Sequence, residues 1–343
     1  MAESMKAALW MGTEQIEVKQ VPRRQPGPGE ALVKVGYGGI CGTDLMIYLG
    51  KHPRAKAPMA MCHEFSGIVA EVGAAEDAPV VGTQVAINPL LTCGVCYACR
   101  SGIPHVCARL GLVGIDADGG FAEYAVVPNH TCRPVPDTIS LQDAALVEPL
   151  AVAVHAVRVS DLKVGDVTAV LGAGPIGIMT AQVARQAGAR QVFVSEMSPT
   201  RIEIAQALGF DVIDVKEQSV VDVVLEATEG VGVPVVFETA GVPPTIDDAG
   251  KVVRIAGQIL QVGMPKGPVS IDLTPLMFRE IRRTPIRVYR EEDFDLAIAI
   301  AATGAIDMEK PVTHVLPLDE LAEAMEIAHQ ATDACKILLD PNG

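Results

Sequence analysis

Four cysteines within one short segment constrain this chain more than any other feature. Cys93, Cys96, Cys99 and Cys107 follow the order C-x2-C-x2-C-x7-C. Four thiolates at such spacing can close a tetrahedral zinc site, and a site with four sulfur ligands is structural because no coordination position stays open. Free or disulfide-bonded cysteines are the alternative, which the tight spacing disfavours. We therefore predict a lobe folded around one zinc ion, with any chemistry located elsewhere.

The composition indicates a two-domain protein without polyanionic partners. The chain has 343 residues, and its 27 basic and 42 acidic residues give a net charge of −15. An acidic surface disfavours non-specific binding to nucleic acid or to anionic membranes. The first six residues carry no apolar segment of signal-peptide length, and the glycines of the uncharged stretch 167–184 indicate a turn rather than a membrane span. We expect a soluble, cytoplasmic protein.

The predicted secondary structure changes near residue 150. Before it, short β-type runs at residues such as 31–35, 66–72 and 83–87 predict a compact, partly open β-barrel. After it, strands alternate with helices, which predicts right-handed βαβ units in a parallel sheet. The strands are expected at residues 167–171, 191–195, 210–215, 234–238 and 258–262, and the helices at residues 175–187, 199–208, 219–228 and 244–253. Helices at 294–302 and 318–329 and a strand at 335–339 are expected to pack back on the first part.

The segment Gly172-Ala173-Gly174-Pro175-Ile176-Gly177 joins a predicted strand to a predicted helix. In that context a G-x-G-x-x-G run is the fingerprint of a dinucleotide site, and a turn without a ligand is the alternative. Gly172 permits the tight turn, Gly174 lets the backbone approach a pyrophosphate, and Gly177 lets the helix pack closely on the strand. Free N–H groups at the helix N-terminus then face the phosphates.

The choice of dinucleotide depends on Glu196, which ends the next predicted strand. A carboxylate there accepts hydrogen bonds from the adenosine ribose and repels a 2′-phosphate, so NAD is favoured over NADP. Arg201, which can stack on adenine or reach a phosphate, counts against that choice. A solvated charge at a strand end is the alternative interpretation of Glu196. Val262, which ends the strand predicted at 258–262, is assigned to the same cofactor site.

Three separate segments carry further candidate metal ligands. Cys41 opens the run Cys41-Gly42-Thr43-Asp44, His63 and Glu64 are adjacent, and Glu148 precedes a proline. Each has an ordinary alternative, because a buried cysteine is usually a small apolar residue and a single histidine is usually a satisfied core residue. Spacing alone does not join positions so far apart.

Taken in order, these segments resemble the zinc-dependent medium-chain alcohol dehydrogenases over almost the whole chain. The matching order is residues 41–44, 63–64, the four cysteines, 120–124, 148–149 and 172–177. The polyol, butanediol and threonine dehydrogenases are the most similar subgroup, because Glu148 stands where liver-type enzymes have a cysteine. The resemblance implies a GroES-like β-barrel catalytic domain at residues 1–150, completed by residues 289–343, and a Rossmann NAD-binding domain at residues 151–288.

The resemblance also implies a second metal site and a reaction. Cys41, His63 and Glu148 would bind a catalytic zinc, with Glu64 as an alternate ligand, so that each chain would hold two zinc ions. Three protein ligands leave a fourth position for substrate. Hydride would pass from a secondary alcohol to the nicotinamide of NAD, giving a ketone. Thr43 would take the proton of the substrate hydroxyl and pass it to the nicotinamide ribose; a hydroxyl satisfied by the backbone is the alternative.

Substrate and assembly are inferred from the same resemblance. The stretch from Glu148 to Ala156 favours a polyol, diol or sugar, because the Gly-Asn pair typical of threonine dehydrogenases is missing after it. Oxidation of an amino alcohol, as by L-threonine 3-dehydrogenases, stays open. The full ligand set disfavours a non-catalytic dinucleotide sensor and a zinc-free quinone reductase.

Relatives with the cysteine lobe imply a homo-oligomer, a tetramer rather than a dimer, with strands near residues 285–289 pairing across subunits.

Three positions depart from the family pattern. Met46 stands where many relatives have the histidine that ends the proton relay, which leaves His52 or direct release to water as the exit path. Cys62 replaces the usual glycine before His63, and simple packing is favoured over a spare ligand or an oxidation-sensitive thiol. Arg287 is not clearly in register with the pocket arginine of polyol enzymes, which weakens the case for a sugar alcohol over a smaller diol.

Overall fold

The structure is a computed structural model that describes residues 3–76, 78–331 and 333–343. The chain divides into two compact units. The first unit is built from the residues up to 148, together with 290–303 and those from 312 onward, and the second from residues 149–289 and 304–311. None of the helices in the described ranges combines the length and the apolar character that a membrane span requires.

The first unit is built mainly of β-sheet. Its smaller sheet has the order β2-β1-β4, formed by β1 (Ser4–Gly12), β2 (Gln15–Pro22) and β4 (Met59–Ala60). Its larger sheet has the order β10 (Cys132–Pro134), β6 (Gln84–Ile87), β5 (Glu64–Val72), β3 (Glu30–Gly39), β18 (Lys336–Asp340) and β17 (Val312–Pro317), with β9 (Tyr124–Pro128) also paired to β3. The smaller elements are α1 (Gly42–Tyr48), β7 (Leu90–Leu91), α2 (Tyr97–Arg100), η1 (Pro104–Val106), β8 (Gly111–Leu112), η2 (Asn129–Thr131), α3 (Leu141–Ala144), α10 (Glu291–Ala302), η3 (Leu318–Glu320) and α11 (Leu321–Gln330).

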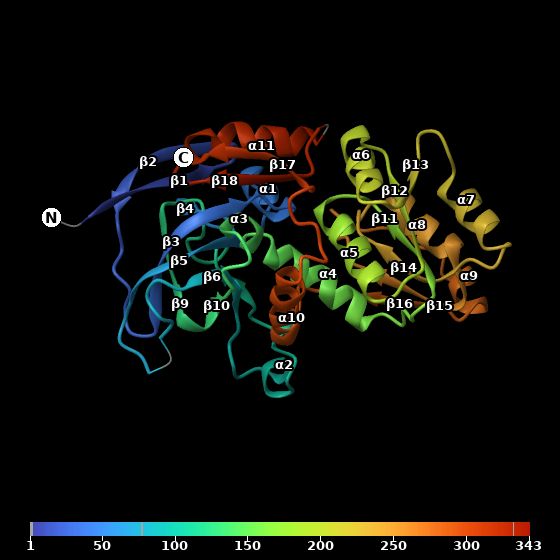
Figure 1. Cartoon of the computed structure of the whole chain (residues 1–343), viewed down its shortest axis with the longest axis horizontal. Helices are drawn as coiled ribbons and strands as arrows, with labels where there is room; N and C mark the ends of the chain where they lie inside the picture. The colour runs from blue at the N-terminus through green and yellow to red at the C-terminus, as the bar shows by residue number, and fades with distance from the viewer. Residues whose placement is uncertain (1–2, 77, 332) are drawn as a thin grey trace. The chain divides into compact units, whose positions relative to one another are not determined.

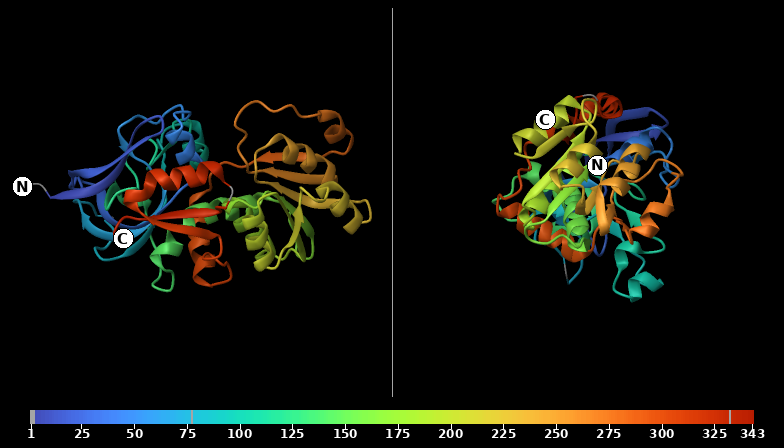
Figure 2. Two further views of the ribbon diagram at one scale, coloured as in Figure 1. Left: turned by 90° about the horizontal axis from the view of Figure 1, so that it is seen from above. Right: turned by 90° about the vertical axis from the view of Figure 1, so that its right-hand side faces the viewer.

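The end of the chain completes this larger sheet. Strand β18 pairs antiparallel with β3 through Leu338–Gly39 and Leu339–Gly38, and parallel with β17. In Figures 1 and 2 the red C-terminal segment accordingly lies beside the blue N-terminal strands. The pairing brings Lys336, the first residue of β18, to the end of β3, which Cys41 follows closely in the chain.

The second unit is a parallel sheet with the order β13 (Asp211–Asp214), β12 (Gln191–Glu196), β11 (Val167–Leu171), β14 (Val233–Glu238), β15 (Val253–Gln261) and β16 (Arg282–Pro285). Every neighbouring pair in it is parallel. The connecting helices are α5 (Pro175–Gln186), α6 (Pro199–Ala207), α7 (Val220–Ala227), α8 (Pro243–Val252) and α9 (Leu273–Phe278), and α4 (Val147–Val159) precedes β11. The predicted doubly wound parallel sheet is confirmed.

The apolar sequence of the central strands explains this sheet. All five residues of β11 are buried, as expected for a parallel strand covered on both faces. Residues Leu171, Phe193, Val236 and Ile259 from four adjacent strands belong to one buried cluster. The strand order reverses between β11 and β14, and open sheets of this type bind ligands at such a switch point, beyond the carboxyl ends of the strands. The glycine segment 172–177 follows β11 directly at that end.

Candidate active site and metal centres

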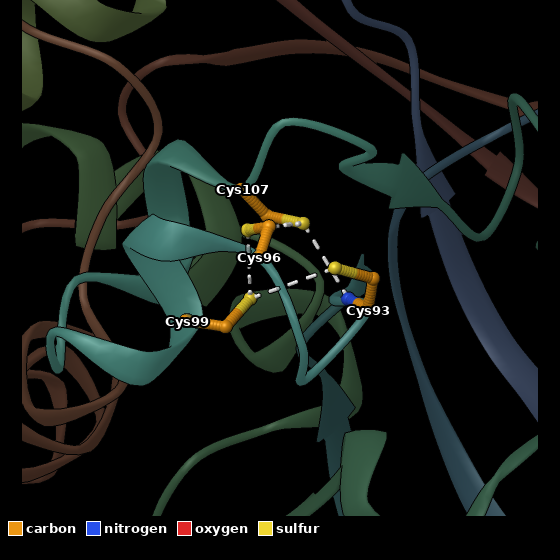
Figure 3. A group of neighbouring side chains, drawn as sticks. All are labelled: Cys93, Cys96, Cys99 and Cys107. Atoms are coloured by element: carbon orange, nitrogen blue, oxygen red, sulfur yellow. Dashed lines mark hydrogen bonds between the residues drawn. The ribbon is translucent and has the colours of Figure 1, made fainter.

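The four cysteine side chains of the lobe point toward a common centre (Figure 3). Their sulfur atoms are separated by 3.5 Å (Cys96–Cys99), 3.8 Å (Cys96–Cys107) and 4.0 Å (Cys93–Cys99). A tetrahedral zinc with Zn–S bonds of about 2.3 Å holds its sulfurs about 3.8 Å apart, whereas a disulfide requires about 2.05 Å. The donor geometry therefore fits a zinc ion.

Backbone N–H groups prepare the lobe for a cation. Hydrogen bonds from the N–H groups of Val95 and Cys96 lower the pKa of Cys93 to about 5. The N–H groups of Cys93 and Arg109 lie 3.4 and 3.3 Å from the sulfur of Cys107 and donate to it. Thiolate, the form that binds metal, is thus stabilised at Cys93, whereas burial raises the pKa of Cys99 to about 11. The lobe extends away from the strands of its unit (Figures 1 and 2).

A second group of donors lies in the body of the first unit. The ligand atoms of Cys41, His63 and Glu64 all lie within 4.8 Å of one another. The pairing of β3 with β5 explains their convergence, because Gly39 pairs with Glu64 at the end of that ladder. Cys41 follows β3 after one intervening residue and His63 directly precedes β5, so both ligands are carried to the same end of the strand pair.

Asp44 links the segment of Cys41 to the segment of Cys62 and His63 through hydrogen bonds, a role that the sequence analysis did not predict. Its Oδ2 accepts a hydrogen bond of 2.9 Å from the N–H of Cys41, and its Oδ1 accepts one of 3.2 Å from the N–H of Cys62. Oδ1 also lies 3.8 Å from Nδ1 of His63. The carboxylate is fully buried. Its position in the run from Cys41 to Asp44 was the available signal, but sequence alone offers no means of seeing the Cys62 contact.

The donor atoms of this buried cluster suit a metal ion. Burial raises the pKa of the Cys41 thiol, and the neighbouring charge of Glu64 raises it further. Burial also raises the pKa of Asp44. Nδ1 of His63 is buried and has no hydrogen-bond partner among the described residues. Thiolate, imidazole and carboxylate are the donors that zinc prefers, so these residues fit a zinc ion.

Lys336 brings a positive charge into this cluster, and the sequence analysis missed it. Its Nζ donates to the carbonyl oxygen of Ile40 at 2.9 Å and to Oε2 of Glu64. The side chains of Lys336 and Glu64 are only 2% and 3% exposed. A lysine inside an otherwise apolar final strand was the signal that could have revealed it. One oxygen of Glu64 is therefore already engaged.

The remaining residues assigned to the catalytic site take different positions. Glu148 lies outside the group of Cys41, His63 and Glu64, although its charge contributes to raising the pKa of His63. Thr43 is half-buried, and its hydroxyl makes no hydrogen bond within the described chain. His52 has its Nδ1 occupied, since it accepts from the N–H groups of Arg54 and Ala55 at 3.4 and 3.2 Å.

Cys62 adopts a backbone conformation that suits the glycine it replaces. Its φ is +83°, in the left-handed region that non-glycine residues seldom occupy. The side chain is fully buried, and its thiol lies 3.4 Å from the carbonyl oxygen of Glu64 and 3.6 Å from that of Gly39. These contacts support packing as the role of the thiol.

In the second unit, the glycine segment forms a tight turn between β11 and α5. Gly172 has a φ of +104°. A Cβ atom on Gly177 would lie 1.9 Å from the carbonyl oxygen of Gly172, so the helix can approach the turn only with glycine there. A Cβ on Gly174 would meet nothing closer than the guanidinium of Arg201, at 4.0 Å. Gly174 thus borders open space, as the approach of a pyrophosphate requires.

Glu196 is fixed beside this turn. Its Oε2 accepts a hydrogen bond of 2.9 Å from the N–H of Ala173, and its Oε1 accepts from the N–H groups of Met197 and Ser198 at 2.7 and 3.0 Å. The carboxylate is 8% exposed. Val262 lies on the other side of the sheet centre: it directly follows β15, which pairs with β14, and donates its N–H to the carbonyl oxygen of Glu238 at 2.8 Å.

Gly177 and Gly174 are predicted to respond differently to substitution by alanine. Gly177→Ala should lower the free energy of unfolding by about 2–4 kcal/mol, because overpacking and backbone shifts add up at a closed contact. Gly174→Ala should leave stability within about 0.5 kcal/mol but weaken binding of a dinucleotide about tenfold, because its methyl group would enter the space expected for the pyrophosphate. Urea unfolding and NADH fluorescence titration measure the two effects. An equal loss of stability in both variants would contradict the different roles assigned to Gly174 and Gly177.

The chain matches known proteins along nearly its full length. Residues 27–137 match the alcohol dehydrogenase GroES-like domain, and residues 175–303 match the zinc-binding dehydrogenase domain. The 2-dehydro-3-deoxy-L-galactonate 5-dehydrogenase of Pseudoalteromonas atlantica is 36% identical over 98% of this chain and 99% of its own. The L-threonine 3-dehydrogenase of Pyrococcus abyssi is 38% identical over 95% of each.

A solved structure gives the same result. The 2R,3R-butanediol dehydrogenase of Bacillus subtilis superposes with a TM-score of 0.91 and 34% identity, covering 98% of this chain and 100% of that one. The β-rich unit is thus GroES-like and the parallel sheet is of the Rossmann type. The chain belongs to the zinc-dependent medium-chain alcohol dehydrogenase family.

Proposed function

We propose that this chain is an NAD-dependent zinc dehydrogenase that oxidises a secondary alcohol, namely a polyol, diol or sugar, to the ketone. The convergence of Cys41, His63 and Glu64 at the end of the β3–β5 ladder carries the proposal. These residues would hold a zinc ion, which would supply a Lewis acid that lowers the pKa of the substrate hydroxyl. The third protein ligand we propose is a carboxylate, either Glu148, whose charge acts on His63, or Glu64 as its alternate, so that a fourth position stays open for substrate.

The protein residues then orient the substrate and remove its proton. Thr43 lies two residues after Cys41, and its hydroxyl is not engaged by any other described group. It is available to accept the proton of the substrate hydroxyl and to pass it to the nicotinamide ribose. Asp44 holds the backbone of Cys41 and of Cys62, which keeps the ligand-bearing segments in place while substrates exchange.

NAD is the cofactor that Glu196 favours. Three backbone N–H groups fix its carboxylate at the end of β12, so its negative charge cannot turn away from a ligand. A 2′-phosphate would be repelled at that position, whereas ribose hydroxyls can donate to the remaining lone pairs of the carboxylate. With the four-cysteine lobe, the proposal gives two zinc ions and one NAD per chain.

The second candidate is oxidation of an amino alcohol. The match to an L-threonine 3-dehydrogenase of Pyrococcus abyssi is as high as that to the sugar-acid enzyme, which keeps threonine as a substrate to be tested. The sequence after Glu148 lacks the Gly-Asn pair of that group, so the polyol, diol or sugar is placed first.

The assembly we propose is a homo-oligomer, with a tetramer favoured over a dimer, in the cytoplasm. Strand β16 is an edge strand, and Leu273, Met277 and Phe278 of the nearby helix α9 are 61%, 76% and 86% exposed. An open strand edge beside exposed apolar side chains is typical of a surface that a second copy covers. The molar mass in solution decides the number of copies.

The test combines metal analysis with NAD reduction across a panel of polyols, diols, sugars and L-threonine. We expect two zinc ions per chain and NADH from a secondary alcohol. Thr43→Val should lower kcat by about 10²–10⁴-fold, the usual contribution of a general base, while NADH binding is retained. Near-normal turnover in Thr43→Val would remove that residue from the mechanism. NADH formed only from L-threonine would favour the second candidate.

A further inference from the structure

Glu238, the last residue of β14, is a fully buried carboxylate that accepts hydrogen bonds on both oxygens. Its Oε1 accepts from the N–H of Ala240 at 3.0 Å, the N–H of Gly241 at 2.8 Å and the hydroxyl of Thr245 at 2.7 Å. Its Oε2 accepts from Nε2 of Gln261. An acceptor-only side chain is required here, because every partner is a donor.

Gln261 links this carboxylate to a cation on the next strand. Its Nε2 also donates to the carbonyl oxygen of Gly263 at 2.8 Å, and its Oε1 accepts from Nη1 of Arg283 at 2.6 Å. If the side-chain amide of Gln261 were rotated by 180°, its N–H₂ group would face the guanidinium of Arg283, which is also a donor. The negative charge of Glu238 is therefore linked through the side-chain amide of Gln261 to the positive charge of Arg283 on β16. This network explains how the sheet tolerates a buried carboxylate.

The network holds the loops that follow β14 and β15. The carbonyl oxygen of Glu238 accepts from the N–H groups of Val262 and Gly263, both at 2.8 Å. A Cβ atom on Gly263 would lie 2.3 Å from the nitrogen of Gly241, so the two loops meet backbone to backbone. The hydroxyl of Thr239 reaches the carbonyl oxygens of Leu171 and Gly172 at 2.9 and 3.0 Å, which joins the same loops to the glycine turn.

These loops occupy the second half of the dinucleotide site. The glycine turn and Glu196 belong to β11 and β12, on the first side of the switch point, and β14 and β15 lie on the other side. In doubly wound sheets each half takes one nucleotide of the dinucleotide. Resting on the proposed NAD-dependent function, we propose that Glu238 is a positioning residue that fixes the two loops receiving the nicotinamide half of the cofactor, without touching the cofactor itself.

The test separates the two halves of the cofactor. ADP probes the adenosine half alone, and NADH probes both. In Glu238→Gln, the new side-chain N–H₂ group faces a donor in either orientation: the backbone N–H groups of Ala240 and Gly241, or Nε2 of Gln261. A buried donor left without an acceptor changes an equilibrium constant about tenfold or more. We expect NADH to bind about tenfold more weakly to the variant, with ADP binding unchanged within about twofold and KM for NAD raised more than kcat is lowered.

Gln258→Met is the matched control, because Gln258 precedes Gln261 by three residues on the same strand but bonds to a different set of partners. It is 3% exposed, accepts from the N–H of Asp161 at 2.8 Å and donates to the hydroxyl of Thr284 at 3.0 Å. Its loss should lower the melting temperature without changing the ratio of NADH to ADP affinity.

Three other outcomes would overturn the inference. In the first, Glu238→Gln lowers the melting temperature but leaves that ratio unchanged, which would make the network structural only. In the second, ADP and NADH binding weaken equally. In the third, the wild-type chain binds no dinucleotide, which would remove the proposed function as well, whereas the first two leave it standing.

Discussion

Replacing Lys336 with methionine should destabilise the metal-free protein by about 3–5 kcal/mol, the usual cost of breaking a buried ion pair from one side. The reason is the environment of Glu64. Its side chain is 3% exposed, and Lys336 is the cation that contacts it. Methionine fills a similar volume, so the loss comes from the uncompensated carboxylate and the unpaired carbonyl of Ile40 rather than from a cavity. Urea unfolding monitored after removal of metal by a chelator measures the change.

The double variant Glu64→Gln/Lys336→Met is the control for that result. Removing both charges leaves no buried unpaired ion, so the double variant should be more stable than Lys336→Met alone by at least about 1 kcal/mol. Saturating zinc should also restore part of the stability of Lys336→Met, since a divalent ion replaces the missing positive charge next to Glu64. A loss below about 1 kcal/mol in the single variant would show that Lys336 does not compensate Glu64.

The parallel sheet was predictable because its signals are local. Strands β11, β12 and β14 are rich in buried apolar residues; Gly172 follows the first, and Glu196 and Glu238 end the other two. The local pattern did not predict strand β16, because its four residues, Arg282 to Pro285, include two arginines and a proline; the resemblance indicated a strand only near residues 285–289. Such a composition is tolerated only at an edge, where one side of the strand needs no partner, and no local pattern reveals which strand is the edge.

The two candidate metal sites also differ in how far the sequence could predict them. The four cysteines lie within fifteen positions, so their spacing alone predicted a shared site. Cys41 and His63 come together only because β3 pairs with β5, and Lys336 joins them because the last strand of the chain pairs with β3. Contacts between residues hundreds of positions apart leave no periodicity in the sequence. The family resemblance supplied the ligands, but it did not supply the lysine that holds Glu64.

Substituting a lobe cysteine should remove one of the two zinc ions. In Cys99→Ser the hydroxyl would stand 3.5 Å from the sulfur of Cys96 but is a poor zinc ligand at neutral pH. Structural zinc contributes about 10–16 kcal/mol of apparent binding free energy in isolated zinc-finger peptides. The lobe has little else to hold it folded, because its apolar residues Val95, Tyr97 and Val106 are exposed. We expect one zinc ion per chain and protease cleavage between residues 93 and 107 at least about tenfold faster than in the wild type.

Cys132→Ser is the matched control for the lobe variant. Cys132 is also buried in the first unit, where burial raises its pKa to about 12, but it belongs to neither cluster. Its substitution should leave two zinc ions per chain and an unchanged cleavage rate within the lobe. Retention of both ions in Cys99→Ser would contradict a four-sulfur site. Loss of both ions would instead mean that the lobe supports the centre of Cys41, His63 and Glu64, because the lobe would then no longer fold independently of that centre.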